Sequence, residues 1–308
     1  MIRASLIIPV YNYADSFRCV LESIKFLDFS RDAFEVIIIE DFSDESVINI
    51  VDKYKHDFNI KYYRMNTNKG RAAARNKGIE LAESELLIFN DGDRILQPDM
   101  IIQHLQLHSA KEKAVCIGNN IDLFLFDNKV IKDEKQLIEE LFFKNGGKYG
   151  KCRFHYYYQE LVGKIYDYRG QTDCDIAWIS LLSGNFSIRK QCIMEVGGFD
   201  ENFKRWGIEN MELGYRLQKS GIKYYYNKKA VNYHIYHKQN RNAYELEDAI
   251  EYFYRKVKDE RIKKYYDFLL GKINLGELTE NYIDSKEYYN SKHLGARYIS
   301  TRKEAQDE

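Results

Sequence analysis

Short apolar runs alternate with amphipathic segments over the first 118 residues. Four apolar runs predict strands, at residues 4–10, 36–39, 60–65 and 86–89. The segments between them predict helices, at residues 14–27, 43–54 and 69–82. Strand and helix in regular succession are typical of β-α units, so the pattern predicts an α/β fold with a mostly parallel central sheet.

Three predicted strands end in polar or aromatic side chains. These side chains are Tyr11, Asp41 and Asp91. In an open α/β sheet, ligands bind outside the carboxyl ends of the strands. We therefore expect the three positions to share one edge of the sheet and to line a binding site.

The rest of the chain is less regular. Residues 119–177 mix charge and aromatics without clear periodicity, order returns from residue 178 to 236, and a charged helical pattern follows from residue 244. We expect a first half over residues 1–118 and a second half of the same domain over residues 119–240. A helical C-terminal extension over residues 241–308 completes this division.

Composition narrows the class of protein. The 47 basic and 47 acidic residues cancel, so no global charge attracts nucleic acid. No stretch approaches the roughly 20 apolar residues of a membrane span, and five scattered cysteines without Cys-x-x-Cys spacing fit a reducing compartment. The sequence favours a cytoplasmic protein without a transmembrane segment, which leaves peripheral contact with a membrane possible.

Asp91-Gly92-Asp93 follows the apolar run that ends at Phe89. Two carboxylates separated by one residue at a strand end can hold a divalent cation against a diphosphate, because a turn aims both at one site. Oxygen ligands and an open coordination sphere suit Mn²⁺ or Mg²⁺. Asp-Gly is also a common tight turn, and that is the alternative reading of the triplet.

Arg71 and Arg75 stand four residues apart on a predicted helix that Gly70 precedes. That spacing places both guanidinium groups on one face, where they can meet a diphosphate. Ordinary exposure to solvent is the alternative for each arginine.

The four motifs of the first half resemble the nucleotide-sugar half of family 2 glycosyltransferases with the A-type fold. They lie at residues 5–12, 39–43, 68–76 and 91–93. In the second half, residues 183–187, 197–201 and 206–213 resemble the acceptor-side motif of galactosyltransferase and N-acetylgalactosaminyltransferase domains. The resemblance covers about three quarters of the chain and implies a single Rossmann-like nucleotide-diphospho-sugar transferase domain.

The resemblance implies roles on the donor side. Residues Pro9, Tyr11 and Asp41 would contact uridine, Asp93 would bind the metal most directly, and Asp91 would contact ribose or reach the metal through water. The alternative for Asp41 is an acid that interacts with the dipole of a helix N-terminus.

A third metal ligand is expected downstream, where the chain carries His234 and His237. Residues three apart on a strand point to opposite faces, so we expect only one of them at the site. His234 is the preferred ligand and His237 the alternative. A histidine packed in the core is the ordinary explanation for either.

The acceptor motif contributes Gly184, Asn185, Trp206, Glu209 and Glu212 as candidate residues. Glu209 opens a predicted helix, where its carboxylate can take a proton from an attacking hydroxyl. Glu212 also stands four residues before Arg216, which predicts an ordinary helical ion pair. Trp206 can stack on a sugar or anchor the core.

Asn210 follows Glu209 where inverting members of the resembled family usually carry an aspartate, and asparagine cannot accept a proton at neutral pH. Either Glu209 replaces that base or the reaction needs none, as in retaining enzymes. Both stereochemical outcomes therefore stay open.

These features predict a metal-dependent glycosyltransferase that moves a hexose or N-acetylhexosamine from a UDP-sugar to a glycan, a lipid carrier or a protein. One alternative is a weak or inactive UDP-sugar-binding module, which Asn210 motivates. Another is a nucleotidyltransferase of similar topology, against which the motif at residues 206–213 argues. A dehydrogenase is disfavoured because no Gly-x-Gly-x-x-Gly follows the first strand.

Overall fold

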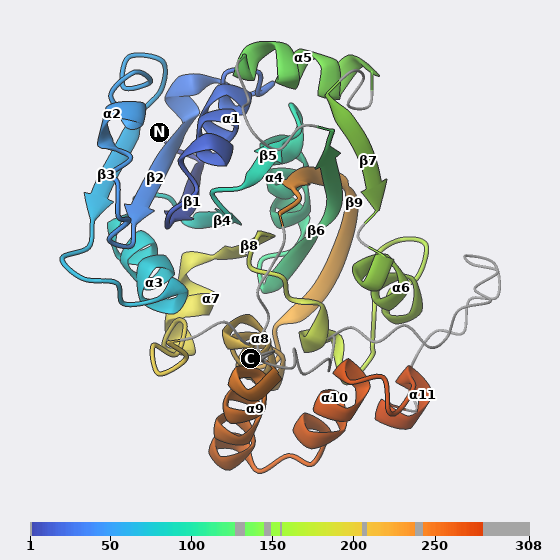
Figure 1. Cartoon of the computed structure of the whole chain (residues 1–308). Helices are drawn as coiled ribbons and strands as arrows, with labels where there is room; N and C mark the ends of the chain where they lie inside the picture. The colour runs from blue at the N-terminus through green and yellow to red at the C-terminus, as the bar shows by residue number, and fades with distance from the viewer. Residues whose placement is uncertain are drawn as a thin grey trace, which may run out of the picture.

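The computed structural model of the 308-residue chain describes residues 2–126, 133–144, 149–154, 156–204, 208–237 and 243–279. Nine strands among these residues form one sheet in the order β3-β2-β1-β4-β8-β6-β9-β5, and β7 pairs with β6 beside this path. Helices cover both faces of the sheet (Figure 1).

The first half supplies four neighbouring parallel strands and one short strand that pairs antiparallel with the second half. Its strands and helices are β1 (Ala4–Val10), α1 (Ala14–Ile24), β2 (Phe34–Glu40), α2 (Ile48–Val51), β3 (Ile60–Arg64), α3 (Arg71–Leu81), β4 (Leu86–Asn90), β5 (Arg94–Leu96) and α4 (Met100–Ala110). A 3₁₀ turn at Arg31–Ala33 precedes β2. Strand β1 pairs in parallel with both β2 and β4, and β2 pairs in parallel with β3. The four strands predicted from the apolar runs are confirmed.

The prediction of a helix over residues 43–54 is wrong at its start, because the helix observed there is α2, which begins at Ile48. Loop hydrogen bonds hold the preceding residues instead. The Ser43 hydroxyl accepts from the Asn12 N–H at 3.1 Å. The Glu40 carboxylate accepts from the Ser46 hydroxyl at 3.0 Å and from the Val47 N–H at 3.3 Å. Side chains that compete for backbone groups in this way delay a helix.

The second half adds antiparallel pairings to the sheet. Its elements are β6 (Ala114–Leu125), α5 (Glu134–Lys144), β7 (Gly150–Phe154), α6 (Tyr156–Ile165), a 3₁₀ turn at Ala177–Ser180, β8 (Asn185–Arg189), α7 (Lys190–Glu195), α8 (Glu209–Lys219) and β9 (Lys223–Ile235). Strand β8 is antiparallel to β4 and β6, whereas β6 and β9 are parallel. The parallel arrangement expected from the sequence therefore describes the first half, and the complete sheet is mixed.

The expected division at residue 118 falls inside β6, at the point where the register between β6 and β9 shifts. Because the strand and the sheet continue through this point, the two halves share one framework. We retain the division as a proposal about which side of the site each half serves.

Alternate residues of the central strands pack into different cores. Ile7 and Ile37 join the core under α3 and α8, while Leu6 and Val36 join the core under α1, α2 and α4. This alternation explains the uninterrupted apolar runs, since a parallel strand covered on both faces has no polar side. Gly78 of α3 lets the helix approach the sheet, because a Cβ at this position would overlap the Ile7 side chain.

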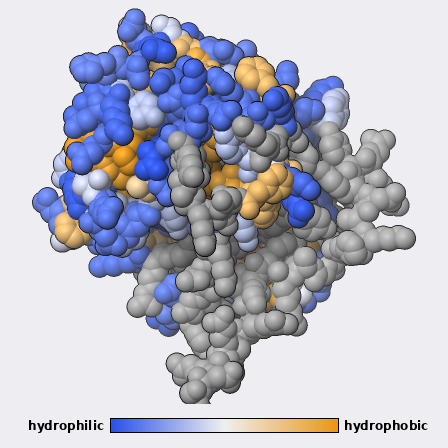
Figure 2. Space-filling view, turned by 45° about the horizontal axis from the view of Figure 1, so that its top comes forward, coloured by the Kyte–Doolittle hydropathy of each residue, from blue (hydrophilic) through white to orange (hydrophobic). Residues whose placement is uncertain are grey.

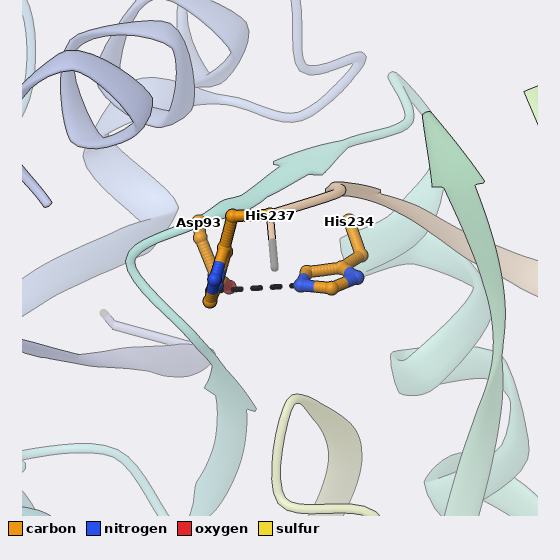
Figure 3. A group of neighbouring side chains, drawn as sticks. All are labelled: Asp93, His234 and His237. Atoms are coloured by element: carbon orange, nitrogen blue, oxygen red, sulfur yellow. Dashed lines mark hydrogen bonds and ion pairs between the residues drawn. The ribbon is translucent and has the colours of Figure 1, made fainter. Parts of the chain in front are cut away.

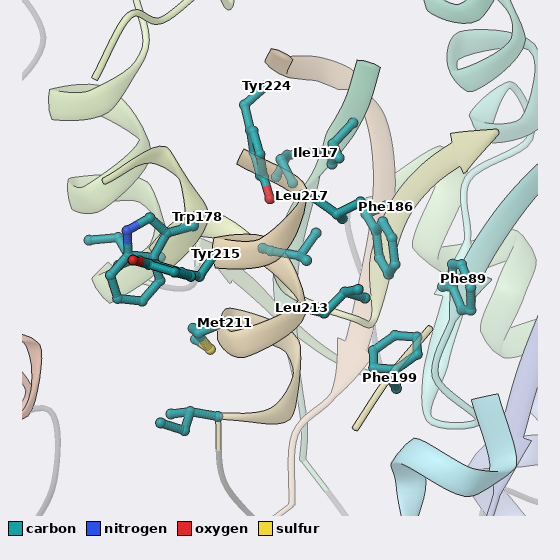
Figure 4. Close-up of a cluster of buried hydrophobic side chains, with 14 of the residues drawn as sticks. Phe89, Ile117, Trp178, Phe186, Phe199, Met211, Leu213, Tyr215, Leu217 and Tyr224 are labelled. Atoms are coloured by element: carbon teal, nitrogen blue, oxygen red, sulfur yellow. The ribbon is translucent and has the colours of Figure 1, made fainter. Parts of the chain in front are cut away.

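The C-terminal helices belong to the core under α3 and α8. They are α9 (Ala243–Val257), α10 (Arg261–Leu269) and α11 (Leu275–Leu278). Trp178 packs edge-on against Tyr215, Phe253 and Tyr265, with ring centroids 5.3–5.8 Å apart. Figure 4 shows Trp178 and Tyr215 beside each other in this core. Within the expected extension, α9 therefore packs on α8 through the contact of Phe253 with Tyr215 (Figure 1).

Candidate active site

The ends of β2, β1 and β4 lie side by side, because these strands are parallel neighbours. This confirms that Tyr11, Asp41 and Asp91 share one edge of the sheet. Pro9 pairs with Ile39 within β1, one residue before the strand ends.

Exposed aromatic rings border this edge. Tyr11, Tyr13 and Phe42 are the exposed rings, and the last has a left-handed backbone with φ of 60°. Asn12 is also left-handed, and its side chain exchanges two hydrogen bonds with Asp44, at 3.0 and 2.8 Å. These bonds tie the loop after β1 to the loop after β2.

Asp41 is buried and accepts hydrogen bonds from the backbone N–H groups of Lys69 and Gly70, both at 2.8 Å. Burial raises the pKa of Asp41 against the lowering effect of these two donors. Gly70 is the residue before α3, so the carboxylate sits at a helix N-terminus, as the alternative reading proposed, although the helix is α3 and not the one after β2. Contact with uridine stays a prediction.

Asn90 and Asn232 hold the turn that carries Asp91-Gly92-Asp93. The Asn90 amide donates to the carbonyls of Asp91 and Arg94, at 2.9 and 2.8 Å. Asn232 donates to the Asn90 side chain at 2.8 Å and to the Gly184 carbonyl at 2.6 Å. Asn90 thus ties the two ends of the turn together, Asn232 joins it to the segment before β8, and both asparagines are buried, so the turn is fixed from within the core.

Asp93, His234 and His237 form a cluster in which one ligand atom of each lies within 4.8 Å of the others (Figure 3). Asp93 Oδ2 is 3.2 Å from His237 Nε2 and 3.7 Å from His234 Nε2. Burial would raise the pKa of Asp93, but the His237 hydrogen bond and the charges of His234 and Arg94 outweigh it and hold that pKa well below its usual range.

Both histidines face the site, so the expectation that only one would do so is wrong. Strand β9 ends at Ile235, and the strand alternation therefore does not extend to His237. His234 Nδ1 lies 2.8 Å from Asp122 Oδ1. A carboxylate on one ring nitrogen orients a histidine so that its other nitrogen faces a metal.

The cluster fits a divalent cation. Asp93 Oδ1 is buried and has no hydrogen-bond partner among the described residues, which is costly unless something else binds it. One carboxylate and two imidazoles make a donor set that Mn²⁺ accepts more readily than Mg²⁺, because imidazole suits the transition metals.

Asp91 does not join the cluster. Its carboxylate lies 2.9 Å from Arg75 and 3.5 Å from Arg94. Burial would raise the pKa of Asp91, but the charges of Arg75 and Arg94 lower it overall. Gly184 makes this arrangement possible, since a Cβ there would lie 2.6 Å from Asp91 Oδ2.

The structure separates the two arginines of α3. Arg71 is exposed, whereas Arg75 is only 1% exposed. Arg75 NH1 lies 3.1 Å from Glu209 Oε1 at the start of α8. One buried guanidinium therefore joins Asp91 on the donor side of the site to Glu209 on the acceptor side.

Among the acceptor-side candidates, Glu209 has an unsatisfied atom. Glu209 Oε2 is buried and has no hydrogen-bond partner within the part of the chain that the structure describes. Asn210 donates its amide to the Leu181 carbonyl. Trp206 lies outside the described residues, so its role stays a prediction.

The acceptor-side candidates Asn185 and Glu212 stabilise the fold through buried contacts. The Asn185 amide donates to the carbonyls of Asn119 and Ala230, at 3.0 and 2.9 Å. Glu212 is fully buried between Arg216 and Lys256, each at 2.7 Å, which confirms the predicted ion pair with Arg216. Their contacts with an acceptor stay predictions without geometric support.

Sequence reasoning missed Asp122, Arg94, Asn90 and Asn232. Asn90 could have been noticed as a polar residue between a buried strand and the acidic triplet. Asp122 gave no such signal, since its partner His234 lies 112 residues away.

Comparison with known proteins identifies the family. Residues 5–166 match the model of glycosyl transferase family 2, and residues 163–238 match that of the N-terminal domain of galactosyltransferase. The chain belongs to glycosyl transferase family 2. Its fold is the A-type glycosyltransferase fold.

Relatives support this membership at modest identity. The chain is 27% identical over 259 residues to the uncharacterized glycosyltransferase YfnE of Bacillus subtilis (strain 168), covering 77% of this chain and 66% of that protein. It is 28% identical over 226 residues to validoxylamine A glucosyltransferase of Streptomyces hygroscopicus subsp. jinggangensis (strain 5008), covering 71% and 52%. The chain thus spans half to two thirds of the length of these relatives.

Solved structures share the fold. The S. aureus TarS 1-349 structure in complex with UDP-GlcNAc superimposes with a TM-score of 0.62 at 15% identity, over 90% of this chain and 77% of that one. GalNAc-T7 with UDP, GalNAc and Mn²⁺ gives a TM-score of 0.60 at 17% identity, over 87% and 50%. Within the described residues, no helix is both long and apolar enough to cross a membrane.

Proposed function

We propose that this glycosyltransferase moves a hexose or N-acetylhexosamine from a UDP-sugar to an acceptor with the help of Mn²⁺ or Mg²⁺. The observation that carries the proposal is the cluster of Asp93, His234 and His237 at the ends of the parallel strands, with its unsatisfied carboxylate oxygen. The UDP complexes and the Mn²⁺ complex among proteins of the same fold support it.

Asp93, His234 and His237 would hold the cation, with Mn²⁺ the better match for two imidazoles. When bound, the cation would neutralise the diphosphate of the donor as the glycosidic bond breaks. Asp122 keeps His234 oriented for this role by its bond to Nδ1.

The exposed rings around the ends of β1 and β2 would receive the nucleotide. Tyr11 and Phe42 present aromatic faces on which a base can stack. Arg71 is exposed at the first turn of α3, where its guanidinium can reach a phosphate. Arg75 acts differently, since its buried guanidinium positions Asp91 and Glu209.

Glu209 would take the proton of the attacking acceptor hydroxyl. Arg75 binds Oε1, while Oε2 is buried without a partner among the residues described. The Asn210 amide is occupied by the Leu181 carbonyl and has no basic atom to offer. Of the two acids in this motif, Glu209 fits the role better, since Glu212 is enclosed by Arg216 and Lys256.

Asp93→Ala tests the proposal. We expect the variant to lose Mn²⁺ binding and UDP-sugar turnover, measured by calorimetry and by release of UDP, while its circular dichroism spectrum remains that of the wild type. Asp173→Ala is the matched control, because that side chain is 99% exposed. Full turnover by Asp93→Ala, or by the wild type in excess chelator, would refute the proposed metal dependence.

A further inference from the structure

The face of the sheet that carries the metal cluster continues beyond it toward β7. In a pleated strand, every second side chain points to the same face. Asp122 and Phe124 of β6 therefore share one face, and the bond between Asp122 and His234 shows that it is the face of the active site. Leu123 points the other way, into the core beside α1 and α5.

Two aromatic rings stack on this face. The rings of Phe124 and Tyr236 have centroids 4.3 Å apart and an angle of 29° between their planes. Tyr236 is 44% exposed and stands between the two histidines of the cluster in the sequence. Stacked aromatic rings with an open face are suited to the apolar face of a sugar ring.

Two basic residues of β7 flank the aromatic pair. Lys151 and Arg153 lie directly opposite Phe124 and Asp122 in the antiparallel pairing of β6 with β7, so all four side chains share a face. Both basic side chains are exposed, and the Arg153 guanidinium stands 5.5 Å from the centre of the Phe124 ring. Within the described ranges, neither forms an ion pair with a carboxylate.

Figure 2 shows that hydrophilic side chains dominate the visible face of the molecule and that apolar ones are exposed in small groups. Phe126, one residue past the end of β6, extends the aromatic surface with a side chain that is 61% exposed. We call Phe124, Tyr236, Lys151 and Arg153 together the basic aromatic platform.

We propose that the basic aromatic platform binds the acceptor, and that the acceptor is an anionic oligosaccharide. A sugar ring would stack on the exposed ring of Tyr236, which Phe124 supports, next to the metal cluster, and negatively charged groups of the neighbouring sugar would meet Lys151 and Arg153. This proposal rests on the proposed transferase function and names the substrate class of the same site.

The test uses two anionic tetrasaccharides, of galacturonate and of hyaluronan, and two neutral ones, of methyl-esterified galacturonate and of chitin. Calorimetry with the wild-type chain should detect the anionic pair and not the neutral pair, with affinity falling as salt rises. Lys151→Gln/Arg153→Gln should weaken anionic binding by about tenfold. Phe124→Ala should weaken it by about the same factor through lost stacking.

Arg255→Gln/Lys263→Gln is the matched control, because it removes the same charge from exposed residues of α9 and α10. Thermal unfolding of each variant separates lost binding from lost folding. Equal binding of anionic and neutral saccharides, no binding of either anionic probe, or an unchanged affinity in Lys151→Gln/Arg153→Gln would overturn the inference. Hydrolysis of UDP-sugars by the wild type reports on the proposed function independently of these outcomes.

Discussion

Arg75 and Glu209 form a buried ion pair, with NH1 3.1 Å from Oε1, between residues 134 positions apart in the sequence. Arg75 also binds Asp91 at 2.9 Å and stands 5.4 Å from the centre of the Phe199 ring. The guanidinium therefore compensates two carboxylates that come from opposite sides of the active site.

Replacing Arg75 by methionine should destabilise the protein by about 3–5 kcal/mol, because the buried Glu209 carboxylate loses its partner and the half-buried Asp91 keeps only Arg94. Urea unfolding at neutral pH measures this change. Adding Glu209→Gln should recover part of the loss, since the amide no longer buries a charge, and a double-mutant cycle gives the coupling. Arg71→Met, at an exposed position one turn earlier on α3, should change stability by less than about 0.5 kcal/mol. Equal effects of the two methionine substitutions would contradict this account.

Asp122→Ala should weaken Mn²⁺ binding by about 10- to 100-fold, because His234 loses the carboxylate that orients its ring. Asp122→Asn should lie between the alanine variant and the wild type, since its carbonyl oxygen can still accept from Nδ1. Titration of Mn²⁺ followed by electron paramagnetic resonance measures both affinities. Asp173→Asn provides an exposed control, and identical affinities in all four proteins would exclude a positioning role for Asp122.

Local sequence pattern accounts for the donor half of the fold. Strands β1, β2, β3 and β4 were predictable because each is a short apolar run followed by an amphipathic helix or a turn. The helix expected after β2 begins late, because Ser43 and Glu40 accept hydrogen bonds from the Asn12 and Val47 N–H groups and these bonds outweigh the helical pattern of residues 43–47. Such bonds depend on where the backbone places each side chain.

The site was predictable only where its residues adjoin strand ends. Asp93 followed from the acid-x-acid spacing, and His234 from the search for a third ligand. The burial of Arg75 was not predictable, because i and i+4 spacing places Arg71 and Arg75 on one face without saying what covers it. The residue that pairs with Arg75 is Glu209, which lies 134 positions later in the sequence. His237 was ranked below His234 as a metal ligand because its position depends on where β9 ends, which the sequence pattern does not show.

Two buried histidines of α4 should make the stability of the folded protein sensitive to acid. His104 Nδ1 and His108 Nε2 both lie within 2.9 Å of the Ser187 hydroxyl. Burial lowers the pKa of His104 from 6.5 to about 3, and burial with the nearby charge of Arg189 lowers that of His108 to about 4. Both rings therefore stay neutral in the folded protein at pH values where the unfolded chain binds protons.

The sign of the effect follows from that difference in bound protons. The contribution of the two histidines to the free energy of unfolding should be at its maximum above about pH 6.5. As the pH drops below that value, the free energy of unfolding should fall by about 1.4 kcal/mol per pH unit for each histidine, until the folded pKa of that histidine is reached. His108→Gln should lose less stability than the wild type between pH 6.5 and 4.5, as urea unfolding can measure. His56→Gln, at an exposed histidine, should parallel the wild type. Parallel curves for His108→Gln would show that this ring does not contribute.

Gly184 lies against the side chains of Asp91 and Arg94. An added Cβ would lie 2.6 Å from Asp91 Oδ2 and still closer to Arg94 Nε, and the Gly184 carbonyl is already bound by Asn232. Gly184→Ala should therefore displace Asp91 from Arg75 and reduce UDP-sugar turnover, with a stability loss of about 1–3 kcal/mol.

Steady-state kinetics and urea unfolding of Gly184→Ala measure the two effects separately. Gly197→Asn is the control, because no described atom lies within 4 Å of an added Cβ there and asparagine tolerates its left-handed backbone, with φ of 83°. Arg94→Ala should relieve part of the overlap, so Gly184→Ala/Arg94→Ala should be less destabilised than the sum of the single variants. If the two substitutions are additive, the side chain of Arg94 does not limit the space at Gly184, and the close contact with Asp91 alone explains the need for glycine.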